Sequence, residues 1–253
     1  MTSTTGFGID IGGSGIKGAP VDLATGELLG DRMRVDTPQP SKPKQVADVV
    51  VKIIEHFGWQ GPVGVALPCV IKVGTALTAA NVDKHWQGTD ATRLVAERLG
   101  RERNQVVVLN DADAAGLAEI NNGAGVGRGG VVLLLTFGTG IGSALFLNGK
   151  LIPNTEFGHL EVDGRDAEDR AAASAKEEQG MSWHEWAKEV SKYLRTLENL
   201  LWPDLIIVGG GVSRRAEKWL PLLDVRSTVV PAVLQNNAGI VGAAAAAASG
   251  IDH

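Results

Sequence analysis

Two glycine-rich segments with the same flanking pattern most strongly constrain how this chain can fold. Asp10–Lys17 reads Asp-Ile-Gly-Gly-Ser-Gly-Ile-Lys, and Thr136–Ser143 reads Thr-Phe-Gly-Thr-Gly-Ile-Gly-Ser. Each joins one apolar β-type run to another, so each predicts a β-hairpin closed by a tight glycine turn. The repetition predicts two similar lobes facing each other across a cleft, each offering one turn to a ligand.

Strands and helices are expected to alternate along the rest of the chain. Apolar residues recur at helical spacing in 41–57, 89–99, 182–202 and 238–249, and short β-type runs fill 63–67, 105–109 and 204–208. This alternation predicts an α/β protein. Three further expectations are a strand continuing over 27–35, a strand over 70–76 and a helix directly after the triple glycine 209–211.

Composition excludes several classes of function. The chain has 253 residues, a formal net charge of -5 and a single cysteine. An acidic chain is a poor match for the phosphates of nucleic acid, and one cysteine allows no internal disulfide. No apolar run has membrane length and no signal peptide is recognised, so we expect no membrane partner and a cytoplasmic location.

The hairpin turns are candidate phosphate sites. Backbone N–H groups in a glycine turn form a nest for anions, to which Ser14 and Lys17 would add donors. Asp10, at the end of the first strand, is a candidate ligand of Mg²⁺, because hard cations prefer oxygen. An ordinary β-hairpin would explain either turn alone, but the second copy favours a functional role.

A second candidate is Asn110-Asp111-Ala112-Asp113, where a strand meets a helix. An Asn or Asp at such a junction is commonly a helix cap. The carboxyl end of a strand is also where open α/β sheets bind ligands, and a carboxylate there can accept the proton of an attacking hydroxyl. We assign the base to Asp111 and a structural role to Asp113. Glu156 and His159, three residues apart, are candidates to bind adjacent hydroxyls of a sugar.

Taken together, these motifs resemble the ROK sugar kinases, and among them the polyphosphate glucokinases of actinobacteria. The resemblance covers essentially the whole chain and also rests on Asn81-Val-Asp-Lys84, Val208-Gly-Gly-Gly-Val-Ser213 and Asn237-Ala-Gly-Ile-Val-Gly242. It implies a two-lobed actin-like (ribonuclease H-like) α/β fold with an interlobe cleft. We expect an N-terminal lobe over 1–113, onto which helix 238–250 packs back, and a C-terminal lobe over 114–237.

The resemblance also implies the reaction and the residues. The enzyme would be a phosphotransferase that moves the terminal phosphoryl group of polyphosphate, and also of ATP, to the 6-hydroxyl of glucose, with Asp111 as base and Mg²⁺ as cofactor. Glucose would be held by Asn81, Asn110, Asp111, Glu156, His159 and Glu168. The donor would be bound by Asp10, Gly12, Gly13, Ser14, Gly15, Lys17, Thr136, Gly138, Thr139, Gly140, Gly209, Gly210 and Gly211.

Two departures from the family pattern matter. Many relatives bind zinc through the histidine at position 159 and a cysteine-rich loop after it, but residues 163–175 contain no cysteine, so we expect no zinc site. Cys69 stands where relatives usually have glycine. Because the first apolar β-type run begins at Phe7, we expect no helix-turn-helix of the kind that the family's repressors carry.

Alternatives remain for the donor and for catalysis. A strictly ATP-dependent glucokinase or hexokinase that accepts mannose, and a sugar sensor without activity, are the competing functions. A long polyanion should need a basic track, and a homodimer is the association the resemblance implies. Candidates for the track are Lys84, Arg128, Lys150, Arg214, Arg215 and Lys218.

Overall fold

The computed structural model describes residues 4–250, which divide into two compact units. Among the described residues, the first unit comprises 4–122 together with 237–250, and the second comprises 123–236. The division follows Asn122 and not the expected position 113, because helix α3 (Asp111–Asn122) packs along helix α7 (Ala238–Ser249) within the first unit.

The first unit is built on a five-stranded sheet with the strand order β3-β2-β1-β4-β7. The expected hairpin forms its centre, where β1 (Thr5–Ile11) pairs antiparallel with β2 (Gly15–Asp22). β3 (Met33–Asp36) extends one edge, and the parallel strands β4 (Val63–Leu67) and β7 (Val106–Asn110) extend the other. The carboxyl ends of β1, β4 and β7 therefore lie at one edge of the sheet.

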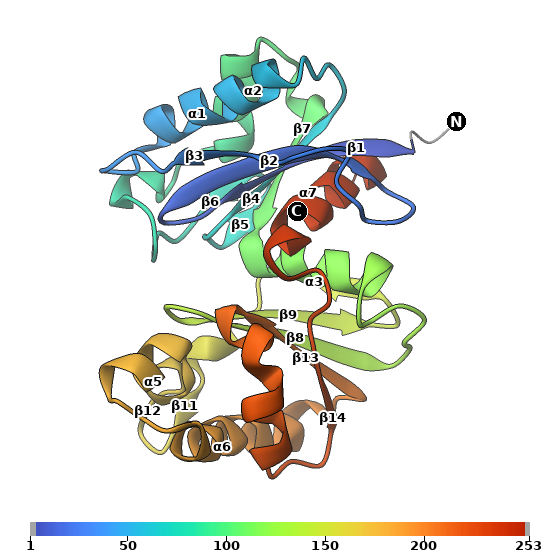
Figure 1. Cartoon of the computed structure of the whole chain (residues 1–253). Helices are drawn as coiled ribbons and strands as arrows, with labels where there is room; N and C mark the ends of the chain where they lie inside the picture. Colours follow the sequence, from blue (N-terminus) through green and yellow to red (C-terminus); the bar gives the residue numbers. More distant parts are fainter. Residues whose placement is uncertain (1–3, 251–253) are drawn as a thin grey trace. The chain divides into compact units, whose positions relative to one another are not determined.

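Helices cover both faces of this sheet (Figure 1). α1 (Pro43–His56) and α2 (Ala91–Leu99) pack on one face, and α3 and α7 lie on the other. α7 approaches unusually closely, because a Cβ added at Gly8 or Gly64 would lie 1.8 Å from a carbonyl oxygen of α7. Two glycines of the sheet thus let the alanine-rich helix rest directly on the backbone of the strands.

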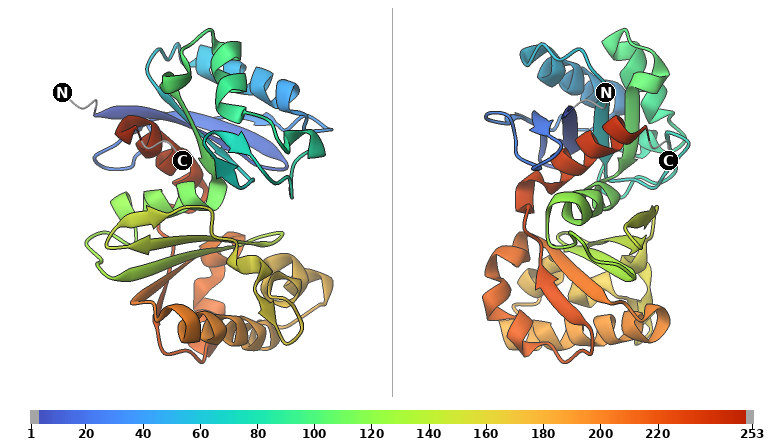
Figure 2. Two further views of the ribbon diagram at one scale, coloured as in Figure 1. Left: turned by 180° about the vertical axis from the view of Figure 1, so that it is seen from behind. Right: turned by 90° about the vertical axis from the view of Figure 1, so that its right-hand side faces the viewer.

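The second unit repeats the same plan. Its sheet has the order β10-β9-β8-β13-β14, in which β8 (Val131–Phe137) and β9 (Ile141–Leu147) form the second expected hairpin. β10 (Lys150–Ile152) extends it antiparallel, and β13 (Leu205–Gly210) and β14 (Thr228–Pro231) run parallel to β8. Figure 2 shows the sheet and its helices from two further sides.

Helices α4 (Glu168–Ala171), α5 (Ala173–Glu178) and α6 (Trp183–Leu201) complete the second unit. α6 begins with a capping box in which Ser182 and Glu185 exchange side-chain and backbone hydrogen bonds. Its apolar face packs into a core with an aromatic centre, where the rings of Phe137, Trp186 and Trp219 meet edge to face.

Two local expectations were wrong. Residues 70–76 do not form one strand, because Val73 and Gly74 adopt positive φ and fold them into β5 (Ile71–Lys72) and β6 (Thr75–Ala76). Residues 27–35 contribute only β3 and an isolated bridge at Leu28. The helix expected at the triple glycine is present as a 3₁₀ helix, Gly211–Lys218, with a kink at Arg215.

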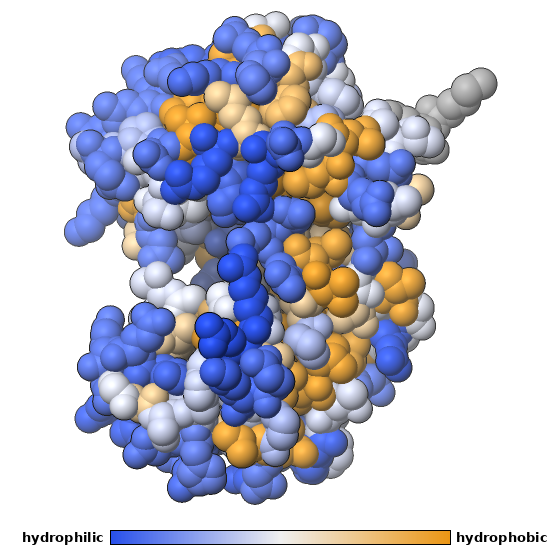
Figure 3. Space-filling view, in the orientation of Figure 1, coloured by the Kyte–Doolittle hydropathy of each residue, from blue (hydrophilic) through white to orange (hydrophobic). Residues whose placement is uncertain are grey.

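The surface is that of an ordinary globular chain. In the view of Figure 3, hydrophilic residues cover most of the visible surface of each unit, with apolar side chains between them. Within residues 4–250, no helix combines the length and apolar character needed to cross a bilayer.

Candidate functional site

Side chains from neighbouring segments donate hydrogen bonds to the carbonyl groups of the first hairpin turn. The carbonyl oxygens of Gly12, Gly13 and Ser14 accept hydrogen bonds from the side chains of Thr37 (2.6 Å), Gln39 (3.2 Å) and Arg34 (3.0 Å), respectively. Gly13 and Ser14 are exposed. Gly12 N–H donates within the turn to the Gly15 carbonyl at 3.1 Å, so the N–H groups of Gly13 and Ser14 are the candidates for an anion nest.

Asp10 lies at the end of β1, directly opposite Lys17 of β2 in the hairpin register. Lys17 Nζ is 3.5 Å from a carboxylate oxygen of Asp10. Burial raises the pKa of the Asp10 carboxyl, and the charges of Lys17 and Arg32 lower it by less. Gly239 of α7 packs against this carboxyl, because a Cβ there would lie 2.9 Å from Asp10 Cγ.

Asn110 and Asp111 lie at the junction of β7 and α3, as expected. The Asn110 side-chain oxygen caps the helix by accepting hydrogen bonds from the N–H groups of Ala112 (2.8 Å) and Asp113 (3.1 Å). Its amide also donates to the Cys69 carbonyl at 3.1 Å. Asn110 therefore has a structural role whatever it binds. Asp111 is half-buried in the first turn of α3, where one of its carboxylate oxygens accepts a hydrogen bond from Ala112 N–H at 2.9 Å.

The predicted sugar contact Asn81 lies beside the first hairpin turn. Its side chain is exposed, and its carbonyl oxygen is 3.7 Å from a Cβ built at Gly13. The segment that carries it is fixed by Ser41, whose hydroxyl accepts from Asp83 N–H at 3.0 Å and whose carbonyl accepts from Trp86 Nε1 at 2.9 Å. The first unit thus brings Asn81 together with the turn 12–14.

The two glycine segments of the second unit lie side by side. Gly209 and Gly210 at the end of β13 pair in register with Thr136 and Phe137 at the end of β8. Gly210 has φ +82, and a Cβ there would lie 2.1 Å from the Phe137 carbonyl oxygen, so only glycine fits. The turn 138–140 and the start of the 3₁₀ helix at Gly211 consequently open onto the same space.

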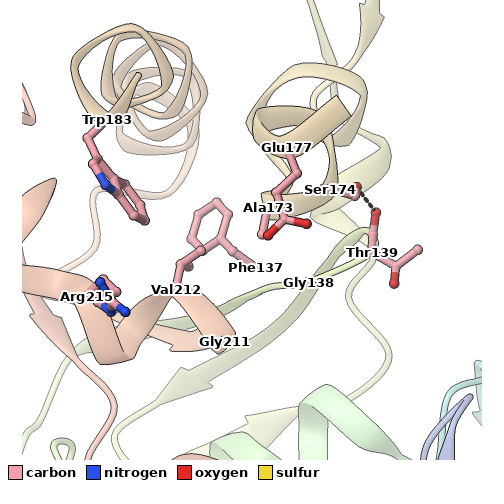
Figure 4. Close-up of a pocket in the computed structure, with 10 residues that line it drawn as sticks. All are labelled: Phe137, Gly138, Thr139, Ala173, Ser174, Glu177, Trp183, Gly211, Val212 and Arg215. Carbon is pink, nitrogen blue, oxygen red and sulfur yellow. Dashed lines mark hydrogen bonds between the residues drawn. The ribbon is translucent and has the colours of Figure 1, made fainter. Parts of the chain in front are cut away.

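That space is a cavity of about 570 Å³ within the second unit (Figure 4). Gly138, Thr139 and Gly211 line one part of it, and Ser174 fixes the turn by donating its hydroxyl to the Thr139 carbonyl at 2.6 Å. Trp183 and Arg215 lie at the other side of the cavity (Figure 4). The remaining lining residues are Phe137, Ala173, Glu177 and Val212.

Several of these lining residues were not assigned to a site from the sequence. Trp183 was interpreted as part of the apolar face of its helix, and Ala173, Ser174 and Glu177 follow no recognisable motif. Arg215 was one of six candidates for a basic track. It lines the cavity, and Arg214 and Lys218 lie on the same 3₁₀ helix. No local pattern distinguishes Arg215 from the other five.

The expected sugar-binding residues of the second unit form a charged cluster. The imidazole of His159 lies 3.9 Å from Glu156 and 3.7 Å from Glu168, and its Nδ1 is 3.0 Å from Asp166. The hydrogen bond to Asp166 is the main cause of a raised pKa of His159, which burial opposes. Burial raises the pKa of the Glu156 carboxyl. Asp166 carried no assignment from the sequence.

Glu168 connects this cluster to the second hairpin. One of its carboxylate oxygens accepts a hydrogen bond from Ile141 N–H at 3.0 Å. A Cβ at Gly140 or Gly158 would lie 2.5 or 3.1 Å from the same oxygen, so both glycines make room for the carboxylate. The structure therefore places Glu168 beside His159 and Glu156, the other two sugar-binding residues expected in this unit.

Comparison with known families gives a direct result: residues 6–172 match the ROK family. The chain belongs to the ROK family. A curated relative, the polyphosphate glucokinase of Mycobacterium tuberculosis, is 57% identical over 252 residues, which cover 100% of this chain and 94% of the relative. The polyphosphate glucokinase of Mycobacterium leprae is 54% identical and covers 98% of this chain and 76% of its own length.

Solved structures agree with this assignment. The inorganic polyphosphate/ATP-glucomannokinase of Arthrobacter sp. strain KM has a TM-score of 0.91 and 51% identity, covering 98% of this ROK chain and 99% of its own. A ROK glucokinase from Streptomyces griseus, solved with glucose and AMPPNP, has a TM-score of 0.80 and 26% identity, covering 95% and 98%. The expected two-lobed actin-like fold of this ROK protein is therefore confirmed.

Proposed function

We propose that this ROK protein is a polyphosphate-dependent glucokinase, which transfers the terminal phosphoryl group of inorganic polyphosphate to the 6-hydroxyl of glucose. The observation that carries this proposal is the 57% identity to a polyphosphate glucokinase along the entire chain. Because the match extends over 252 residues, it includes both hairpins, the glycine segments 138–140 and 209–211, and the β7–α3 junction.

Asp111 is the proposed general base. It lies at the carboxyl end of a parallel strand, and its backbone is held by the Asn110 cap. In the reaction its carboxylate accepts the proton of the glucose 6-hydroxyl while that oxygen bonds to the phosphorus. The bond from the phosphorus to the bridging oxygen of the donor then breaks, and the shortened polyphosphate leaves.

Five residues besides Asp111 are assigned to glucose binding. Asn81 and Asn110 supply amide groups, and Glu156, His159 and Glu168 supply imidazole and carboxylate groups, which suit the hydroxyls of a hexose. The cluster in the second unit supports this assignment, because His159 lies within 4 Å of both Glu156 and Glu168.

The donor is assigned to the two hairpin turns and the 209–211 segment. Backbone N–H groups and Arg215 provide the positive potential that a phosphoanhydride chain needs. Within the described part of the chain, Arg215 forms no ion pair. Trp183, Ala173 and Val212 add an apolar surface to the same cavity, which suits the base of ATP, so we propose ATP as a second donor.

Kinases with such donors generally need a divalent metal ion, and we propose Mg²⁺ held through Asp10. Mg²⁺ is usually bound by one or two carboxylates, with waters and phosphate oxygens as its other ligands. Asp10 fits this mode, because it adjoins the turn 12–14 and burial raises the pKa of its carboxyl despite Lys17 at 3.5 Å. When bound, the ion supplies charge that stabilises the phosphoryl oxygens in the transition state.

The direct test is formation of glucose 6-phosphate by the purified protein with Mg²⁺, comparing polyphosphate and ATP at matched concentrations. We expect activity with both donors and a higher kcat/KM with polyphosphate. Activity with ATP alone would replace the donor assignment by that of an ATP-dependent glucokinase, and adding mannose as acceptor tests the hexokinase alternative. Glucose binding without turnover would support a sensor.

We also propose a homodimer in the cytoplasm. The edge strand β10 and its neighbour β9 in the second unit expose Ile152 and Leu147, which are 44% and 49% accessible and which a second copy could cover. Light scattering of the purified protein should then give twice the mass of the 26.5 kDa chain. A monomeric mass at all micromolar concentrations would contradict the dimer.

A further inference from the structure

The His159 imidazole is surrounded by carboxylates from three different segments. Glu156 directly precedes the 3₁₀ helix Phe157–His159, Asp166 lies on β12 (Arg165–Asp166) and Glu168 begins α4. Only Asp166 is within hydrogen-bonding distance, at 3.0 Å from Nδ1, whereas Glu168 and Glu156 lie at 3.7 and 3.9 Å. Of these three carboxylates, Asp166 is therefore the one that can accept a hydrogen bond from the ring.

We propose that Asp166 is a positioning residue for the sugar-binding site: it accepts the Nδ1 proton of His159 and holds the imidazole as a double donor whose Nε2–H points at a substrate hydroxyl. The inference rests on the proposed role of His159 in glucose binding.

The geometry around Nε2 explains why a double donor is needed. Nε2 is 3.9 Å from Glu156 Oε2, which is too far for a direct hydrogen bond. One sugar hydroxyl can link them by accepting from Nε2–H and donating its own proton to the Glu156 carboxylate. A neutral His159 that still donates Nδ1–H to Asp166 would present a lone pair at Nε2. The hydroxyl could then satisfy only one of its two partners.

The electrostatic surroundings support the charged ring. Asp166, Glu168 and Glu156 all raise the pKa of His159, with the hydrogen bond that the ring donates to Asp166 as the largest cause, and burial opposes them. The imidazolium in turn lowers the pKa of Glu156, which burial raises. Removing the Asp166 charge should therefore lower the pKa of His159 while two of its three carboxylate neighbours remain.

The backbone around Asp166 is fixed independently of His159. β12 pairs antiparallel with β11 (Glu161–Val162), so Asp166 lies opposite Glu161. Asp163, in the turn between these strands, lies 3.6 Å from Lys192 Nζ of α6. An ion pair thus connects this short hairpin to a long helix. We therefore expect a substitution at 166 to change the side chain without unfolding the hairpin.

The test compares Asp166→Asn and Asp166→Ala with Glu161→Gln as the matched control. Glu161 is exposed, carries the same charge and lies opposite Asp166 on the same hairpin. Losing a hydrogen bond to a charged group should raise KM for glucose about tenfold in Asp166→Ala, with kcat within about twofold. Glu161→Gln should leave both unchanged.

The pH profile separates positioning from a merely structural effect. Wild-type KM for glucose should rise as pH increases through the raised pKa of His159, because the neutral ring loses one donor. Asp166→Asn keeps an acceptor for Nδ1–H but loses the charge. In Asp166→Asn, the rise in KM should therefore occur about one pH unit lower than in the wild type. At low pH, where His159 is protonated in both proteins, the two KM values should be equal.

A readout without turnover completes the test. Histidine ring protons titrated by NMR, with the His159 signal assigned by its loss in His159→Gln, should give a lower pKa for His159 in Asp166→Asn and no change in Glu161→Gln. An unchanged pKa and an unchanged KM profile in Asp166→Asn would overturn the inference, even if Asp166→Ala fails to fold. Failure of the proposed function is distinct, because the wild-type protein would then form no glucose 6-phosphate.

Discussion

Asp111→Asn should lower the turnover of glucose phosphorylation by about 10²- to 10⁴-fold, the usual contribution of a general base, while glucose still binds. The amide has the shape of the carboxylate but cannot take up the hydroxyl proton. The fold should persist, because the cap of α3 is supplied by Asn110 and the Asp111 oxygen that accepts from Ala112 N–H has an equivalent in asparagine.

Steady-state kinetics with polyphosphate and calorimetric titration of glucose would measure the two effects separately. Asp90→Asn is the matched control, since Asp90 caps α2 in the same unit by accepting from Arg93 N–H at 2.8 Å, and asparagine preserves that role. Turnover in the control should remain within about twofold of wild type. An Asp111→Asn enzyme with near-normal turnover would remove Asp111 from the mechanism.

Gly242→Ala should destabilise the protein by at least about 3 kcal/mol, at the upper end of what overpacking costs. A Cβ at this position of α7 would lie 1.6 Å from the Ala114 carbonyl oxygen of α3. Helix propensity predicts the opposite sign, since alanine in place of glycine within a helix normally stabilises by about 1 kcal/mol. The close approach of two helix backbones outweighs propensity, because neither backbone can move without leaving the sheet.

Urea denaturation gives the free energy of unfolding needed for this comparison. Gly129→Ala is the control, because Gly129 is exposed and a Cβ there would have its nearest contact at 3.7 Å. Its stability should change by less than about 0.5 kcal/mol. A Gly242→Ala protein as stable as wild type would mean that α3 and α7 do not pack as closely as the structure shows.

Local sequence patterns predicted most of the strands and helices that build the two units. Both hairpins form where glycine turns interrupt apolar runs, and α7 spans the expected 238–249. Errors occurred where backbone conformation depends on few residues. Positive φ at Val73 breaks the expected strand over 70–76. The sequence could not predict this break, because valine rarely adopts positive φ and is typical of strands.

The roles of the predicted site residues remain predictions, and the contacts that these residues make could not be read from the sequence. Glu168, for example, accepts a hydrogen bond from Ile141 N–H, 27 residues away along the chain. The cavity beside Gly138 includes Trp183, which the helical pattern assigned to the core alone.

The sequence by itself determined the family, the α/β class, the two hairpins and the candidate ligand-binding positions along the chain. These follow from residue types over short windows, since glycine turns, apolar periodicity and capping residues act locally. Only the tertiary structure decided that α7 contacts the backbone of the sheet at Gly8 and Gly64, that Gly138 and Gly211 share one cavity, and that Asp166 is the carboxylate bonded to His159. Such contacts join segments whose spacing carries no periodic signal, so they appear only once the strands have paired and the helices have packed.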